Sequence, residues 1–126
     1  MKLLTRLMAL LLAVLLASCA QAHPPLDRAA LDQAVAAGGP VVVHFHANWC
    51  PTCKAQTPVV AQLLSEPPMQ AFKLFIADFD NEKALKAELH VNAQSTFVVF
   101  KGGREVARST GQTSREAIAA TFARAL

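Results

Sequence analysis

The sequence lacks the features on which several classes of protein depend. It has no second Cys-x-x-Cys pair to join Cys50 and Cys53, so its thiols supply only half of a four-thiolate zinc site. It has no excess of one charge: without Lys2 and Arg6, 10 basic residues stand against 9 acidic ones, a balance near +1 that does not favour nucleic-acid binding. It contains no internal repeat or low-complexity tract, and 126 residues suffice for one small domain.

No apolar run is long enough to cross a bilayer as a helix. The run over residues 7–17 has eleven residues, whereas a hydrocarbon core of about 30 Å takes roughly 20 residues. Lys2 and Arg6 precede this run, and small residues follow it. That arrangement is typical of a secretory signal peptide, which is removed from the mature protein.

The signal segment is followed by a cysteine in a distinctive context. Residues 16–19 read L-A-S-C and resemble the lipobox of bacterial lipoproteins, in which the cysteine, here Cys19, becomes the lipidated N-terminus. Ala20 follows it in place of Asp, which resembles the outer-membrane sorting pattern. This predicts a protein anchored by lipid to the outer membrane, on the periplasmic side of the bacterial envelope. The alternative is an ordinary signal peptide cut after Ala22, which would remove Cys19.

The chain therefore divides into three predicted parts. Residues 1–18 are a signal peptide of the lipoprotein type, residues 19–25 are a short polar tether, and residues 26–126 are the folded domain. His23, within the tether, is interpreted as an ordinary surface residue.

Apolar spacing and turn residues predict the elements of the domain. Strand 41–46 is apolar on both faces, which is typical of a central strand in a covered sheet. The chain order predicts the α/β class: a mixed central sheet of about four strands with helices on both faces. The expected helices are 26–37, 51–65, 82–89 and 114–125, and the expected strands are 41–46, 73–79, 96–100 and 105–109, the last two joined by a hairpin turn at 101–104.

The Cys-x-x-Cys pair lies where the central strand gives way to a helix. Cys50 is expected at the helix start, where backbone N–H groups and the helix dipole stabilise a thiolate. Pro51 suits the first helical position because its missing N–H would be unpaired there. Cys53 lies one turn further on, close enough to form a disulfide with Cys50. This placement predicts a reactive dithiol; a permanent structural disulfide and half of a metal site are the alternatives.

Residues 26–126 resemble the thioredoxin family. The segment F-H-A-N-W-C-P-T-C-K at 45–54 is similar to the family signature F-W-A-x-W-C-G-P-C-K, and Pro58 stands where the family has a helix-kinking proline. F-K-G-G at 100–103 resembles the family's hairpin F-K-x-G, and Gly111 matches a glycine near its active site. The resemblance implies the thioredoxin fold.

The resemblance also implies thiol–disulfide exchange, with no metal and no cofactor beyond a redox-active Cys50–Cys53 disulfide. Cys50 would attack a substrate disulfide, and Cys53 would resolve the mixed disulfide. Substrates would be disulfide-bearing proteins or small thiols, with an upstream redox partner in the envelope; the protein would be a monomer that meets the membrane through its lipid anchor. The substrate groove would be formed by Trp49, Pro51, Thr52, Gln94, Ser95, Thr96 and Gly111.

Three positions depart from the family. Gln94-Ser95 replaces its cis-proline, which opens the shield that this proline gives the thiols against metal ions; a tolerated loop substitution is the alternative. His44 stands where the family buries an Asp beneath the disulfide, and Ile76 replaces the Lys that pairs with that Asp. An imidazole can still take the proton from Cys53, so His44 is a catalytic candidate. Burial would keep it neutral.

Two other functions remain open on the sequence. A metal-binding or metallochaperone module would use Cys50, Cys53 and either His44 or His46 as soft ligands. A non-catalytic binding domain would keep the fold and use the groove for partners.

Overall fold

The computed structural model describes residues 23–126, so the predicted signal peptide and Cys19 lie outside the described residues. Every predicted element of the domain is present, with ends that differ by a few residues. The helices are α2 (Arg28–Ala36), α3 (Pro51–Leu64), α4 (Lys83–Glu88) and α5 (Arg115–Phe122), with short 3-10 helices η1 (Met69–Ala71) and η2 (Ala123–Ala125). The strands are β1 (Val41–His46), β2 (Lys73–Asp78), β3 (Thr96–Lys101) and β4 (Arg104–Thr110).

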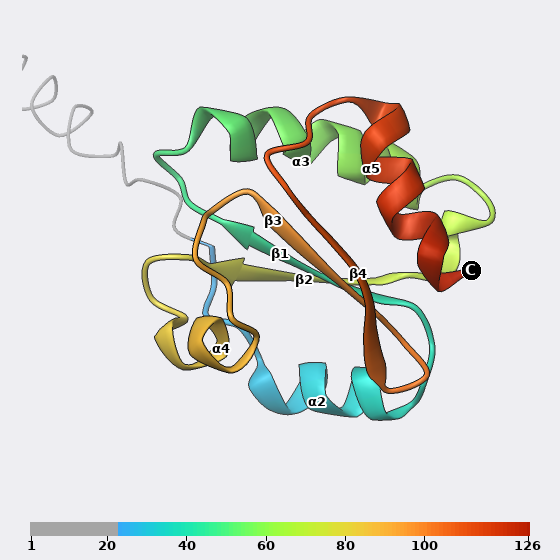
Figure 1. Ribbon diagram of the computed structural model, residues 1–126, viewed down its shortest axis with the longest axis horizontal. Coiled ribbons are helices and arrows are strands. Elements are labelled where there is room, and N and C mark those ends of the chain that lie inside the picture. Colours follow the sequence, from blue (N-terminus) through green and yellow to red (C-terminus); the bar gives the residue numbers. More distant parts are fainter. Residues whose placement is uncertain (1–22) are drawn as a thin grey trace, which may run out of the picture.

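The four strands form one mixed sheet in the order β2-β1-β3-β4. Strand β1 runs parallel to β2 and antiparallel to β3, and β3 and β4 form an antiparallel hairpin. Helices α3 and α5 cover one face and helices α2 and α4 cover the other (Figure 1). The predicted α/β class, the mixed sheet and the central place of β1 are confirmed.

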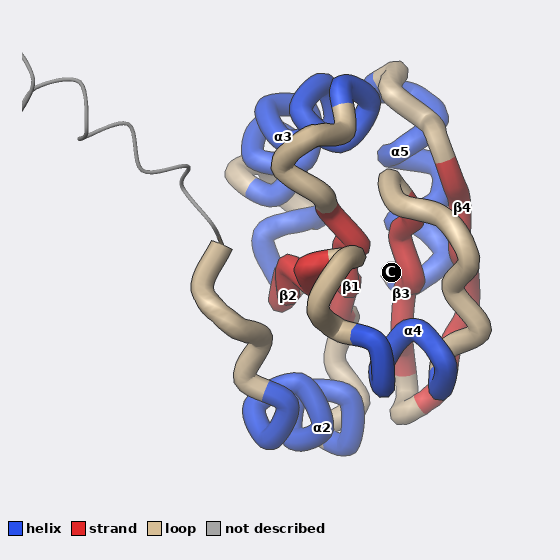
Figure 2. The backbone as a smooth tube through the Cα atoms, turned by 90° about the vertical axis from the view of Figure 1, so that its left-hand side faces the viewer, coloured by secondary structure: helices blue, strands red, loops and turns tan. Residues whose placement is uncertain are grey.

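The core explains why β1 is central. All six of its residues are buried, and its apolar residues divide between two apolar clusters. Val41, Val43 and Phe45 pack toward α2 and α4, whereas Val42 packs with residues of α3 and α5. Because side chains alternate along a strand, His44 shares the face of Val42 and lies beneath α3. The view in Figure 2 shows β1 between the two helical layers.

Helix α2 begins later than predicted because Asp27 is its N-cap. The Asp27 carboxylate accepts a hydrogen bond from Ala30 N at 3.0 Å, so this residue precedes the helix rather than lying in its first turn. The predicted last helix also ends earlier as an α-helix: α5 stops at Phe122, and the chain continues as η2. None of the helices between residues 23 and 126 is both long and apolar enough to span a membrane.

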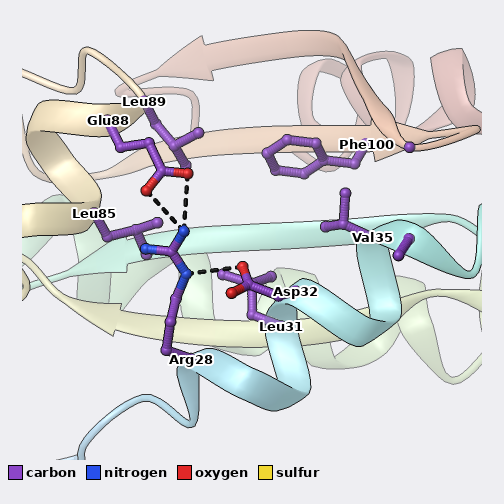
Figure 3. A pocket seen from close by; sticks show the side chains of 10 residues that line it. Arg28, Leu31, Asp32, Val35, Leu85, Glu88, Leu89 and Phe100 are labelled. Atoms are coloured by element: carbon purple, nitrogen blue, oxygen red, sulfur yellow. Dashed lines mark hydrogen bonds and ion pairs between the residues drawn. The ribbon is translucent and has the colours of Figure 1, made fainter.

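Helices α2 and α4 are joined over a cavity of about 240 Å³. The Arg28 guanidinium donates to Asp32 at 2.8 Å and to both Glu88 oxygens at 2.8 and 2.7 Å, beside Leu31 and Leu85 (Figure 3). Exposed ion pairs of this kind contribute at most about 1 kcal/mol each. The charged groups at this cavity are already paired with one another, on the face of the sheet opposite α3.

Candidate active site

Cys50 is the N-cap of helix α3. Its backbone is extended, with φ −88° and ψ 112°, and its sulfur accepts a hydrogen bond from Cys53 N at 3.1 Å. Pro51 occupies the first helical position, as predicted. The sulfur therefore lies at the positive end of the helix dipole, against a backbone N–H that has no partner within the helix. Both features stabilise a thiolate at Cys50.

Both cysteines are free thiols and are covered by the protein. Cys50 is 1% exposed and Cys53 is 0% exposed, and they pack with Ala47 and the half-buried Phe79. The neighbouring Trp49 is 58% exposed. The indole therefore offers a partner an exposed apolar surface on the residue that precedes Cys50.

Trp49 is held in place by a residue from a separate turn. Its Nε1–H donates to Asp80 Oδ2 at 2.8 Å. Of the other predicted groove residues on this side, Pro51 is exposed and Thr52 is half-buried in the first turn of α3. Pro51 and Thr52 form the side of the site that α3 contributes.

The two thiols have different acid–base properties. Burial, together with the hydrogen bond to Cys50, raises the pKa of Cys53 to about 11. Backbone hydrogen bonds from Ala47 and Ser95 act in the opposite direction and are weaker than the burial effect. At neutral pH Cys53 therefore keeps its proton.

His44 lies in a buried hydrogen-bond network centred on Gln56. The Gln56 side chain is 0% exposed, and its Oε1 lies 2.8 Å from His44 Nε2. Its amide nitrogen donates to Ser95 O at 3.1 Å and to Gln112 O at 2.8 Å. Both hydrogens of the Gln56 amide are thus used, so the amide oxygen faces His44. Because that oxygen can only accept, the Nε2 of His44 carries the hydrogen. The lone pair of neutral His44 is consequently on Nδ1.

Gln56 is a site residue that the sequence analysis missed. It follows Cys53 by three positions and precedes the buried Val60 by four, so it lies on the inward face of α3. A glutamine at an inward helical position is a signal, because buried polar groups need hydrogen-bond partners. The partners themselves are remote in sequence, 12, 39 and 56 residues away.

The loop before β3 adopts a conformation that the family resemblance did not imply. The Gln94–Ser95 peptide bond is trans, and Ser95 has φ +57°, a left-handed conformation that costs a non-glycine residue roughly 1–3 kcal/mol. Its hydroxyl donates to Gln94 O at 2.6 Å, so the hydroxyl proton is engaged within the loop. Its N–H donates to Phe45 O at 2.9 Å.

The loop after β4 completes this side of the site. Gly111 N donates to Ser95 O at 3.0 Å, and Gly111 has φ +77°, which favours glycine. The hydroxyls of Thr96 and Thr110 lie 2.8 Å apart. The structure therefore brings the predicted groove residues Ser95, Thr96 and Gly111 together. Ile76 lies opposite His44 in the register of β1 and β2 and is half-buried.

His46 and His23 occupy positions that differ from the sequence interpretation. His23 is half-buried, not an ordinary surface residue, and its ring packs edge-on against His46 with 4.6 Å between centroids. The His46 ring lies 5.5 Å from that of His44. Among residues 23–126, no group of three or more His, Cys, Asp or Glu side chains is arranged to hold a metal ion.

We expect the protein to lose stability as the pH falls from about 6.5 to about 4, because His44 is buried in its neutral form. Burial lowers the pKa of His44 from 6.5 to about 4. Between these values the unfolded chain binds a proton that the folded chain does not. The free energy of unfolding therefore decreases as the pH is lowered, by roughly 3 kcal/mol in total.

Urea denaturation across this pH range measures the loss. In His44→Asn, whose amide can still donate to Gln56, the decline should be smaller by about that amount. His90→Gln removes an exposed imidazole and should keep the wild-type decline. Equal declines in wild type and His44→Asn would show that His44 is not the titrating group.

The fold and the site together define a class of protein. A mixed four-stranded sheet covered on both faces, with a Cys-x-x-Cys pair at the start of the helix after its central strand, is the arrangement of a thioredoxin-fold dithiol protein. A sequence profile of the family described as Thioredoxin matches residues 23–124. The chain belongs to the thioredoxin family.

Individual proteins agree with this assignment. The crystal structure of Trxlp from Edwardsiella tarda EIB202 is 38% identical, with a TM-score of 0.75, over 78% of this chain and 95% of that one. Thioredoxin-1 of Saccharomyces cerevisiae is 36% identical over 92 residues, 71% of this chain and 87% of that protein. Thioredoxin H-type of Fagopyrum esculentum is 38% identical over 76 residues, and this chain spans 64% of its length.

Proposed function

We propose that this protein is a thiol–disulfide oxidoreductase that acts on disulfide-bearing proteins or small thiols. The observation that carries the proposal is the position of the Cys50 sulfur at the N-terminus of α3, where it accepts the Cys53 N–H, with the Cys53 thiol one turn away. The membership of the thioredoxin family supports protein-disulfide oxidoreductase activity. No further cofactor enters the proposed reaction.

The reaction proceeds through two exchanges. The Cys50 thiolate attacks one sulfur of a substrate disulfide, that S–S bond breaks, and the departing thiolate takes a proton from solvent. Cys53 then loses its proton and attacks the Cys50 sulfur, which releases the second substrate thiol and leaves a Cys50–Cys53 disulfide. Two electrons pass to the substrate, and an upstream dithiol restores the reduced pair.

The raised pKa of Cys53 separates the two steps. A thiol that keeps its proton at neutral pH does not compete with Cys50 for the substrate disulfide. Its attack needs a proton acceptor, and we propose His44 for this role. Because His44 Nε2 donates to Gln56, only Nδ1 can accept the proton.

The groove on both sides of Cys50 would receive the substrate. Trp49, fixed by Asp80, stands on one side. Ser95 and Gly111, joined by a hydrogen bond between their backbones, stand on the other. An extended substrate segment would lie between these two walls with its disulfide over Cys50.

Reduction of the disulfides of insulin, with dithiothreitol as electron donor, tests the proposed activity. The wild-type protein should accelerate precipitation of the insulin B chain well above the rate with dithiothreitol alone. Precipitation at the rate of dithiothreitol alone would remove the enzyme function and leave that of a binding module.

We also propose that the protein is exported and held on the periplasmic side of the bacterial outer membrane by lipid on Cys19. The support is the L-A-S-C segment at 16–19 that follows the apolar run over 7–17. A single acyl chain binds membranes only marginally, so stable anchoring requires more than one.

Cell fractionation and mass spectrometry of the mature N-terminus test the anchor. The wild type should appear in the membrane fraction with a lipidated Cys19, and Cys19→Ala should leave that fraction or fail to mature. A wild-type protein that is recovered in the soluble fraction and begins at His23 would contradict the proposal.

A further inference from the structure

A cavity of about 480 Å³ lies next to the chain segments that flank the dithiol and is not used by the proposed reaction. It lies between the segment before α2, the end of β1 and the outward face of α3. The residues that line it include His23, Pro24, His46, Lys54, Pro58 and Ala61. Asn48 and Lys54, which precede and follow the Cys50–Cys53 segment in the chain, both line the cavity.

His46 is the buried polar group of this cavity. It is 5% exposed, and its Nδ1 is buried without a hydrogen-bond partner. An unpaired buried polar atom destabilises a fold, so such atoms in native proteins usually meet a water molecule or a ligand. A group bound in the cavity is therefore a natural partner for His46.

The charges around the cavity favour an anion. Lys54 brings a positive charge to the cavity, and no acidic side chain among the described residues lines it. The His23 ring adds a nitrogen that can donate a hydrogen bond. The Asp78 carboxylate acts on both His46 and His23 from outside the cavity lining, and its two oxygens accept hydrogen bonds from Asp80 N and Asn81 Nδ2. A metal ion fits less well, because Lys54 would repel it and no third protein ligand is present in the described chain.

We propose that this cavity is a subsite for a carboxylate of the disulfide substrate, held by His23, His46 and Lys54 while the disulfide lies over Cys50. The inference rests on the proposed oxidoreductase function and adds a preference among substrates. Disulfides with an acidic side chain next to the cysteine are reduced faster than their uncharged equivalents. Free phosphate has the same charge chemistry and competes for the cavity.

Two blocked dipeptide disulfides, one with Glu beside each cysteine and one with Gln, test this preference. The reduced wild-type protein should react faster with the Glu disulfide, measured as the second-order rate of loss of protein thiols. In His23→Gln/Lys54→Gln that rate should fall about tenfold, as expected for loss of a charge-assisted hydrogen bond to an anion. The rate with the Gln disulfide should change less than about twofold.

Two further variants separate the cavity from general electrostatics. Ala61→Phe fills the cavity without changing charge and should also remove the preference for Glu. Lys101→Gln removes a positive charge at the far end of β3, where Phe100 pairs with Val41, and should keep the preference. Phosphate at constant ionic strength should slow the reaction of the Glu disulfide only.

The outcomes distinguish this inference from the proposed function. A wild-type protein that reduces neither disulfide contradicts the oxidoreductase function itself. Equal wild-type rates for the Glu and Gln disulfides overturn the subsite alone. A preference for Glu that survives in Ala61→Phe also overturns the subsite. Phosphate binding that leaves the Glu rate unchanged does so too, since the cavity would then hold only a free anion.

Discussion

Replacing Cys50 by Ser should reduce disulfide reduction to the uncatalysed background, while the fold is retained. A serine hydroxyl does not form the mixed disulfide through which the reaction passes. Serine is also a favoured N-cap, and its oxygen can accept the Cys53 N–H that the Cys50 sulfur accepts now. The loss of activity is therefore expected without loss of stability, as measured by the insulin assay and by urea denaturation of the same variant.

Replacing Cys53 by Ser gives a different expected result and serves as the matched control. Cys50 can still attack, but nothing resolves the mixed disulfide, so substrate should remain covalently attached and be recovered on a non-reducing gel. Cys50→Ser should trap nothing. Equal activity in wild type and Cys50→Ser would remove the catalytic role and favour a binding module.

Replacing Gln56 by Met should lower the free energy of unfolding by about 2 kcal/mol, although the side-chain volume hardly changes. The change leaves His44 Nε2–H without its partner, and an unsatisfied buried group costs roughly 1–3 kcal/mol. Ser95 O loses one of its two hydrogen bonds and keeps the one from Gly111 N. Gln112 O also loses its partner, but Gln112 is exposed, so water can replace the bond. Urea denaturation measures the loss.

Gln62→Met is the matched control for this prediction. Gln62 lies on the same helix but is exposed, so its replacement should change the stability by less than about 0.5 kcal/mol. The Gln56 network also holds the left-handed Ser95, so Gln56→Met should raise KM for disulfide substrates more than it lowers kcat. Equal stability losses in the two variants would contradict the network.

The elements of the fold could be predicted because their signals are local. The run of valines at the start of β1, the Cys-x-x-Cys pair and Pro51 are contiguous, and each acts on the backbone that carries it. The signals for the ends of the helices are weaker. Asp27 is acceptable both as a cap and in a first turn, and only its hydrogen bond to Ala30 decides between the two.

The electrostatic environment of the dithiol could be predicted only in part. The resemblance to the thioredoxin family placed His44 beneath the site, and the desolvation of a buried imidazole indicated that it is neutral. The tautomer depends on Gln56, and Gln56 depends on two carbonyls from remote loops. Likewise, nothing near His23 in the sequence indicates that it packs on His46. Such contacts arise from tertiary packing, so a single sequence does not reveal them.

A redox titration of the Cys50–Cys53 pair against glutathione tests the central claim most directly. Thiol alkylation followed by mass spectrometry should show one two-electron transition, in which both thiols disappear together. Because neutral His44 stands in place of a buried carboxylate, the midpoint should lie above the roughly −270 mV typical of thioredoxin. Thiols that are lost one at a time, or that form only mixed disulfides with glutathione, would contradict the account of a reversible redox pair.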